Sequence, residues 1–194
     1  MAKKEILIEI SARHAHVTQE HLEILFGEGA SLTPTKLLSQ PGQFASSQKI
    51  DVVGPRSTLK GVTILGPVRS ATQIEISATE ARSLGIKAPI RESSKIKGSA
   101  GAVLVGPAGS IKIEEGVIIA KRHIHFTESE ATEYNVTDKE IVMVKLSSDE
   151  RSLIFDDVVV RIHHSFSAAM HIDTDESNAA GISGEVMGEV IKKV

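Results

Sequence analysis

The sequence predicts a mainly β protein, because most of its apolar segments are too short for helices and are rich in Val and Ile. Several of these segments end at a Gly-Pro pair, and proline both terminates a central strand and opens a turn. A chain of short strands joined by tight turns is typical of a β-barrel or a β-sandwich. Strands are expected at 50–53, 62–65 and 103–105, which precede Gly-Pro pairs, and at 6–10, 73–77, 110–113, 117–120, 141–146 and 158–162.

One seven-residue phrase occurs twice, as Ala-Arg-His-Ala-His-Val-Thr at 12–18 and as Lys-Arg-His-Ile-His-Phe-Thr at 121–127. Each copy follows an apolar run, so we expect its two histidines to lie on one face of a strand end. Each copy also precedes a predicted helix. The recurrence of strand, Arg-His-x-His and helix indicates two similar β-units, whose histidine pairs would meet at a shared cleft.

Helices are predicted at few places in the chain. The first is 18–26, since Thr18 can cap its start and glycines follow its end. In the helix at 127–134, Thr127 and Glu130 have the spacing of a capping box. The others are expected at 78–84 and from about Asp175 onward.

Composition excludes several classes of function. The chain has 194 residues, of which 41% are hydrophobic, enough for one core or two small ones. A net charge of -3, a single Tyr and no Trp argue against a nucleic-acid partner. The absence of Cys removes disulfides, cysteine-based zinc sites and a thiol nucleophile. No apolar segment is long enough to span a membrane, so we expect a soluble cytoplasmic protein with no membrane partner.

Each histidine pair is half of a candidate metal site, since two neutral imidazoles on one strand face can bind a single ion. A third ligand is needed for each pair. Glu75 is one candidate, because the alternation of 72–77 places Gln73 and Glu75 on one face, although an ordinary surface glutamate has the same pattern. His171 is the other, in a polar run after a strand.

Arg69 follows the Gly-Pro pair at 66–67 by two residues and precedes Glu75 by six. A guanidinium beside a metal cluster is suited to a two-pronged hold on phosphate or carboxylate. An exposed arginine on a hairpin has the same local sequence, so this feature alone leaves both interpretations open.

Several longer segments together resemble one protein family. They are 11–16 (SARHAH), 25–27 (LFG), 40–44 (QPGQF), 65–69 (LGPVR), 72–77 (TQIEIS), 88–93 (APIRES), 122–125 (RHIH) and 170–180 (MHIDTDESNAA). These segments are similar to those of the PduL-type phosphate acyltransferases, also called phosphate propanoyltransferases. The resemblance runs from about Ile6 to Ala180 and is far more specific than a single His-x-His pair.

The resemblance implies two β-barrel domains capped by short α-helices, with the active site in the cleft between them. One domain would consist of 1–12 and 121–190, and the other of 13–120. The resemblance also implies two zinc ions per chain. By position, His14, His16 and Glu75 match the ligands of one ion, His123, His125 and His171 those of the other, Arg69 the phosphate-holding arginine, and Ser11, Lys36 and Asn178 residues near coenzyme A.

The implied reaction is the reversible transfer of an acetyl or propanoyl group between coenzyme A and inorganic phosphate. Its substrates and products are acyl-CoA, CoA, phosphate and acyl phosphate, and the usual assembly of the family is a homodimer. Because the chain has no cysteine, direct phosphate attack at a di-zinc site is favoured over an acyl-enzyme on a thiol.

Two alternatives come from other classes of protein. His14-x-His16 followed by Glu20 and Gly27 matches part of the cupin pattern, and two such barrels would form a bicupin-like metal-dependent oxygenase or isomerase. A cupin glutamate lies on a strand, however, whereas Glu20 falls in a predicted helix. The other alternative is a CoA-binding or scaffold protein without turnover, which the retention of all six candidate ligands disfavours.

The segment ahead of the first strand bears on localisation. Family members packaged in bacterial microcompartments carry a short amphipathic extension there. Here only Met1-Ala2-Lys3-Lys4 precedes the strand, and four residues are too few to nucleate a helix. We therefore expect a free cytoplasmic enzyme of acetate or propanoate metabolism, without a microcompartment-targeting extension.

Overall fold

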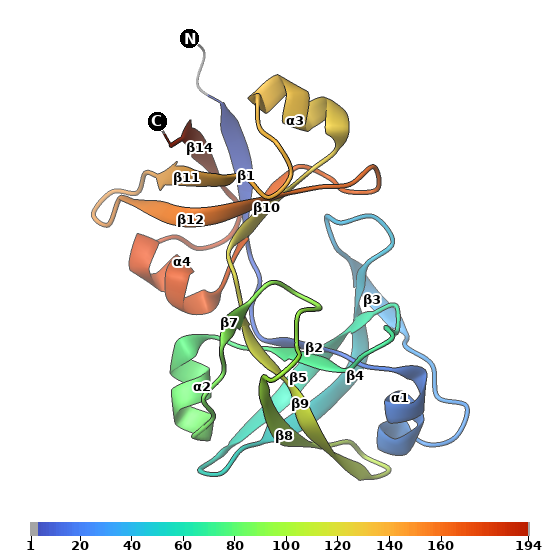
Figure 1. The fold of residues 1–194 in the computed structure, drawn as a ribbon. Helices are drawn as coiled ribbons and strands as arrows, with labels where there is room; N and C mark the ends of the chain where they lie inside the picture. The colour runs from blue at the N-terminus through green and yellow to red at the C-terminus, as the bar shows by residue number, and fades with distance from the viewer. Residues whose placement is uncertain (1–3, 194) are drawn as a thin grey trace. The chain divides into compact units, whose positions relative to one another are not determined.

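The computed structural model describes residues 4–193, which form two compact units (Figure 1). The first unit contains the chain up to Ser11, the short stretch Ser39–Pro41 and the chain from Lys121 onward. The second unit contains Ala12–Leu38 and Gly42–Ala120. Each unit is built around its own closed barrel, so the predicted mainly β class with two barrels is confirmed. The expected division into one domain of 1–12 and 121–190 and another of 13–120 stays a prediction.

The barrel of the first unit closes in the order β1-β13-β10-β12-β11-β14. Side chains that alternate inward along these strands fill its core, among them Ile8, Phe126 and Met170, which are all fully buried. The strands are β1 (Glu5–Ile10), β10 (His123–Phe126), β11 (Ile141–Leu146), β12 (Leu153–Ile162), β13 (Ala169–Ile172) and β14 (Val186–Lys192).

The barrel of the second unit closes in the order β4-β5-β2-β6-β9-β8, because β8 pairs with both β9 and β4. Leu22, Ile64 and Leu104 are among the fully buried residues of its core. Its strands are β2 (His14–His16), β4 (Phe44–Val53), β5 (Thr58–Gly66), β6 (Gln73–Glu75), β8 (Ala100–Val105) and β9 (Ser110–Ala120), and two short additions are β3 (Pro34–Leu37) on β4 and β7 (Ile90–Arg91) on β9.

The two barrels repeat one pattern of strand pairing. β2 pairs antiparallel with β6, and β6 pairs parallel with β9. In the same way β10 pairs antiparallel with β13, and β13 pairs parallel with β1. The other pairings also match, since β5 and β12 run parallel to β2 and β10 respectively. This equivalence supports the expectation of two similar β-units.

The strand that precedes each histidine pair belongs to the opposite barrel. β1 comes directly before β2 in the chain but lies in the first unit, and β9 comes directly before β10 but lies in the second. The expectation that the histidine pairs end the apolar strands is therefore wrong. Each pair begins a short strand of its own, because the chain passes from one unit to the other after Ser11 and after Ala120.

The helices are close to the expected positions and begin at side-chain caps. They are α1 (Gln19–Phe26), α2 (Ala78–Leu84), α3 (Glu128–Tyr134) and α4 (Thr174–Ala180). Thr18 caps α1, and capping boxes start the other three, as the Thr127 and Glu130 spacing predicts for α3. A helix was expected as the last element, but β14 follows α4 and pairs with β1 and β11.

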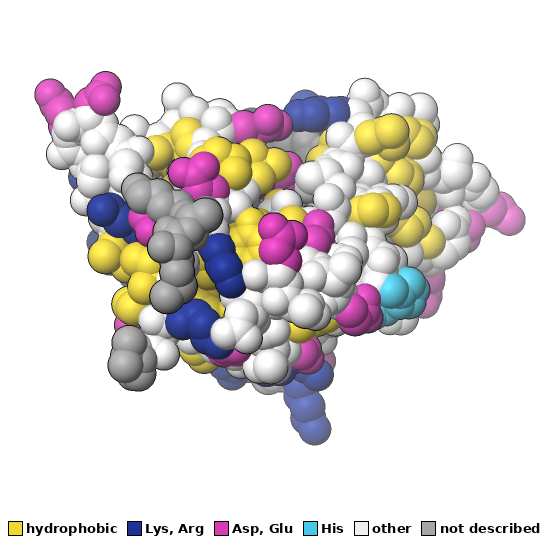
Figure 2. Space-filling model, turned by 90° about the horizontal axis from the view of Figure 1, so that it is seen from above, with side chains coloured by type: hydrophobic (Ala, Val, Ile, Leu, Met, Phe, Trp, Pro, Cys, Tyr) yellow, Lys and Arg dark blue, Asp and Glu magenta, His cyan; other side chains and the backbone are white. Residues whose placement is uncertain are grey.

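The surface of the described residues mixes both signs of charge. On the face drawn in Figure 2, Lys and Arg side chains lie among Asp, Glu and hydrophobic side chains. Between residues 4 and 193 there is no helix with the length and apolar character needed to cross a membrane. Met1-Ala2-Lys3, part of the short segment expected ahead of β1, lies outside the described residues.

The burial of β1 makes a prediction about stability. Ile8→Ala should lower the free energy of unfolding by about 2–5 kcal/mol, because a fully buried isoleucine would leave a cavity in the core of the first unit. Ile154→Ala is the matched control, since this isoleucine of β12 is 52% exposed and should cost less than about 0.5 kcal/mol. Urea denaturation followed by circular dichroism measures both. Equal losses would contradict the placement of β1 in the core.

Candidate active site and metal centres

The second unit brings together His14, His16 and Glu75. These residues each offer one ligand atom, and the three atoms lie within 4.8 Å of one another. The antiparallel pairing of β2 and β6 places His14 directly opposite Glu75, and 3.5 Å separates His14 Nε2 from Glu75 Oε2. All three side chains are buried, with exposed fractions of 6%, 2% and 7%. The geometry thus groups the three residues expected to form one metal site.

The first unit brings together His123, His125 and His171 in the same manner. Their ligand atoms also lie within 4.8 Å of one another. His123 of β10 is directly opposite His171 of β13, and their ring centroids are 5.3 Å apart. The ring of His125 lies 4.7 Å from that of His123 and 5.0 Å from that of His171. This three-histidine group is the counterpart of the group that contains Glu75.

The first histidine of each pair is oriented by a backbone carbonyl. Nδ1 of His14 lies 2.9 Å from the carbonyl oxygen of Ala12, and Nδ1 of His123 lies 2.8 Å from that of Lys121. When Nδ1 carries the proton and donates it to this carbonyl, the lone pair is on Nε2. Hydrogen bonds of this kind fix the ring orientation of metal-binding histidines. The same contact with a backbone carbonyl therefore orients one histidine in each group.

Burial keeps two of the imidazoles neutral. It lowers the pKa of His16 to about 3, with a further contribution from His14, and it lowers the pKa of His125 to about 2, with a further contribution from His123. Burial also opposes the charged forms of His14 and Glu75, but their mutual attraction outweighs it. As a result the pKa of His14 is raised, and the pKa of Glu75 is held well below its usual range.

Buried ring nitrogens without hydrogen bonds provide a test of whether metal ions fit. Within residues 4–193, Nδ1 of His16 and both ring nitrogens of His125 have no hydrogen-bond partner. Such buried polar atoms are costly unless something binds them. Two imidazoles with a carboxylate, or three imidazoles, are donor sets typical of catalytic zinc, which keeps a further position for substrate. The residues present therefore fit the expected zinc ions.

Glu75 is held by neighbours that the sequence did not single out as site residues. Gln73 Nε2 and Ser93 Oγ both donate hydrogen bonds to Glu75 Oε1, at 2.5 and 2.9 Å. This oxygen is thereby engaged, and Oε2 faces His14. The alternation of 72–77 predicted that Gln73 shares a face with Glu75. No local signal indicated Ser93, which comes from the loop after β7.

Arg69 lies beside the same group. Its Nη1 donates to Ser93 Oγ at 3.3 Å, and its backbone NH donates to the carbonyl of Val17 at 2.8 Å. The positive charge of Arg69 lowers the pKa of His16, after burial and His14. Ser93 thus contacts both Glu75 and Arg69, the arginine that was predicted to hold phosphate.

The residues expected near coenzyme A lie on separate elements of the fold. The backbone NH of Ser11 donates at 2.8 Å to the carbonyl of Ile172, which is the residue after His171. Lys36 lies on β3 and Asn178 on α4, and both side chains are exposed. Their contact with coenzyme A stays a prediction. Glu20 lies on α1 with an exposed side chain, outside both ligand groups, which disfavours the cupin alternative.

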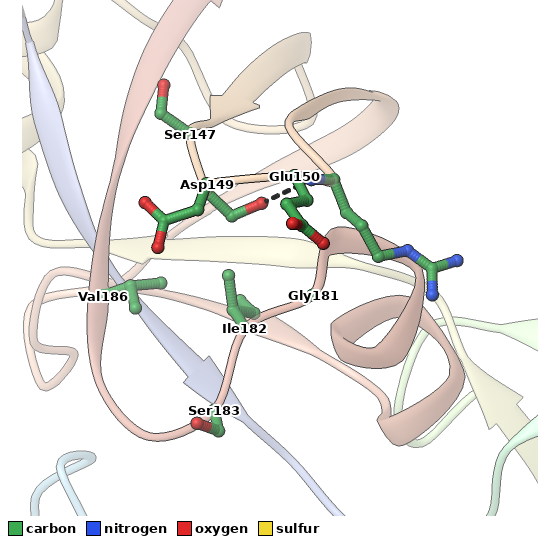
Figure 3. Close-up of a pocket in the computed structure, with 9 residues that line it drawn as sticks. Ser147, Asp149, Glu150, Gly181, Ile182, Ser183 and Val186 are labelled. Atoms are coloured by element: carbon green, nitrogen blue, oxygen red, sulfur yellow. Dashed lines mark hydrogen bonds between the residues drawn. The ribbon is translucent and has the colours of Figure 1, made fainter.

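A hollow in the first unit contains none of the candidate site residues. It has a volume of about 530 Å³ and lies between 147–151 and 181–186 (Figure 3). Asp149, Glu150 and Arg151 are among its lining residues, and the Arg151 backbone NH donates to Ser148 Oγ at 3.1 Å. None of the residues that line this hollow is a histidine.

Comparison with known proteins identifies the family of this chain. The family model described as phosphate propanoyltransferase matches residues 7–183. The phosphate propanoyltransferase of Listeria monocytogenes is 50% identical over 96% of this chain and 87% of its own length. That of Thermotoga maritima is 50% identical over 90% of this chain and 83% of its own length. The phosphate propanoyltransferase of Clostridioides difficile is 46% identical over 98% of this chain and 92% of its own length. This chain therefore belongs to the phosphate propanoyltransferase family, and all six candidate ligands lie inside the matched region.

Proposed function

We propose that this protein catalyses the reversible transfer of a short acyl group, acetyl or propanoyl, between coenzyme A and inorganic phosphate at a di-zinc site. The observation that carries the proposal is the pair of matched residue groups, each built from a strand that begins with His-x-His and one residue of a neighbouring strand. The family supplies the reaction class, since its named relatives are phosphate propanoyltransferases. Acyl-CoA, CoA, phosphate and acyl phosphate are accordingly the substrates and products.

The reaction forms a bond from a phosphate oxygen to the acyl carbon and breaks the bond from that carbon to the CoA sulfur. When bound, the zinc ions would supply Lewis-acid stabilisation of the departing thiolate and of the anionic oxygens. The chain's contribution is to hold the ligands in place before substrate arrives. In the second unit, Gln73 and Ser93 fix one oxygen of Glu75, so the other oxygen stays aimed at His14.

Arg69 would bind and orient the phosphate. Its guanidinium has a planar set of donors that matches two phosphate oxygens, and the hydrogen bond to Ser93 limits its rotation. Orientation of this kind converts an encounter of two substrates into a reaction within one complex. Because the chain has no cysteine, phosphate would attack acyl-CoA directly, without an acyl group carried on a protein thiol.

The proposal is tested by measuring thiol release from a panel of short acyl-CoAs, with and without phosphate. We expect release from acetyl-CoA and propanoyl-CoA that requires phosphate, is lost after metal removal and returns with zinc. Thiol release without phosphate would indicate a hydrolase, and oxygen consumption would favour the bicupin alternative. Coenzyme A binding without turnover would instead indicate a scaffold protein.

The same panel measures acyl specificity. Acetyl and propanoyl groups differ by one methylene, which an apolar pocket distinguishes by about 1–3 kcal/mol, or roughly 10- to 200-fold in kcat/KM. We propose that the enzyme acts as a homodimer, free in the cytoplasm, in acetate or propanoate metabolism. Light scattering at defined concentrations and cell fractionation test these two points separately.

A further inference from the structure

A carboxylate lies next to the three-histidine group on the side of His171. Oε2 of Glu9, on β1, is 3.7 Å from Nδ1 of His171. Both side chains are largely shielded from water, with exposed fractions of 23% for Glu9 and 16% for His171. Glu9 is not one of the three residues whose ligand atoms lie within 4.8 Å of one another, so it neighbours the group without belonging to it.

The strand register explains how these residues come together. β13 lies between β1 and β10 in the barrel, and His171 is directly opposite Glu9 on one side and His123 on the other. Residues paired across neighbouring strands point to the same face of the sheet. Glu9, His171 and His123 therefore form one row across three strands, with the carboxylate at its end.

A second contact fixes the Glu9 carboxylate. Ser39 Oγ donates a hydrogen bond to Glu9 Oε2 at 2.5 Å, which is the same oxygen that faces His171. Ser39 belongs to the stretch Ser39–Pro41, which is part of the first unit. The next residue, Gln40, is 4% exposed, and its side chain donates to the carbonyl of Ser167 at 2.9 Å. A buried anchor thus holds the serine that orients the carboxylate.

We propose that Glu9 is a positioning residue for the metal ion of the three-histidine group. The negative charge of its carboxylate, 3.7 Å from Nδ1 of His171, favours the tautomer that carries the proton on Nδ1 and the lone pair on Nε2, and it raises the basicity of Nε2. The carbonyl groups of Ala12 and Lys121 have the same role for His14 and His123, but they are neutral. This inference rests on the proposed function in that it requires a metal ion at this group.

Glu9→Gln tests the inference, because glutamine keeps the size of the side chain and removes its charge. Metal-free protein is titrated with zinc in competition with a chromophoric chelator, and His171→Ala identifies which of the two binding steps belongs to the three-histidine group. Loss of an outer partner of this kind typically weakens metal binding about 10- to 100-fold. We expect that fall for the three-histidine site alone, and a smaller fall at the same site for Ser39→Ala. Glu5→Gln is the matched control, as an exposed glutamate on the same strand.

A second measurement separates positioning from a general effect on folding. Long-range proton–nitrogen NMR spectra of the metal-free protein report which ring nitrogen of His171 carries the proton. We expect Nδ1 in the unchanged protein and a shift toward Nε2 in Glu9→Gln. Unchanged zinc affinity in Glu9→Gln would overturn the inference while leaving the proposed function intact. Absence of zinc binding in the unchanged protein would overturn both.

Discussion

His14→Ala and His123→Ala will each reduce the zinc content of the protein by about one ion per chain and abolish phosphate-dependent thiol release. Each substitution removes one of three candidate ligands, and the remaining two would not hold a catalytic ion tightly. The effects are expected at different groups, because His14 lies in the second unit and His123 in the first. Elemental analysis of the purified variants, together with the thiol assay, measures both consequences.

The control for these variants is His164→Ala. His164 is exposed and lies outside both ligand groups, so its removal should leave two ions per chain and full activity. The double variant with both His14 and His123 replaced should contain almost no zinc. Full metal content in either single variant would show that the altered residue is not a ligand, and the assignment of that group would fail.

Arg69→Lys will raise the phosphate concentration needed for half-maximal rate by about 10- to 100-fold, while changing the requirement for acyl-CoA little. Lysine keeps the positive charge beside Glu75 but loses the planar pair of donors and the geometry of the hydrogen bond to Ser93. The expected loss corresponds to about 1.5–3 kcal/mol, the usual value of a hydrogen bond to a charged group. Steady-state kinetics with each substrate varied in turn distinguishes the two requirements.

Arg91→Lys is the control for Arg69→Lys. Arg91 is an exposed arginine on β7 of the same unit, and its Nη1 donates to the carbonyl of Ile90. Its replacement should leave the kinetics for both substrates unchanged. If Arg69→Lys also leaves the phosphate dependence unchanged, Arg69 supports the structure around Ser93 and does not bind phosphate.

The sequence correctly predicted elements that are marked by capping residues or by a clear alternation of apolar and polar residues. The boundaries of α2 are those expected, because Ser77 and Glu80 form a capping box and Gly85 adopts the left-handed conformation after Leu84. The alternation in 72–77 correctly placed Gln73 on the side of Glu75 and Ile74 in the core. β14 was missed, because its alternation is weak and its place in the barrel depends on partners more than 40 residues away in the chain.

The six candidate ligands were found through the repeated phrase and the family resemblance, and the structure groups them as expected. Ser93 and Glu9 were not found, because their contacts cross between strands and loops that are distant in sequence. A serine in a loop and a glutamate in an alternating strand have no local signature of a site. The strand register and the 39–41 stretch give Glu9 its neighbours, and the loop after β7 brings Ser93 to Glu75.

The position of β1 also has a consequence for biosynthesis. Among the strands of its barrel β1 is made before the others, but its neighbours, β13 and β14, are made last. At roughly 5–20 residues per second, β1 waits on the order of ten to forty seconds before its partners exist. The strands of the second barrel, by contrast, are all complete once Ala120 has been made. During translation the group of His14, His16 and Glu75 can therefore assemble before the core around Ile6 and Ile8 exists. Until the chain is complete, these two isoleucines are shielded from water only if a chaperone binds them.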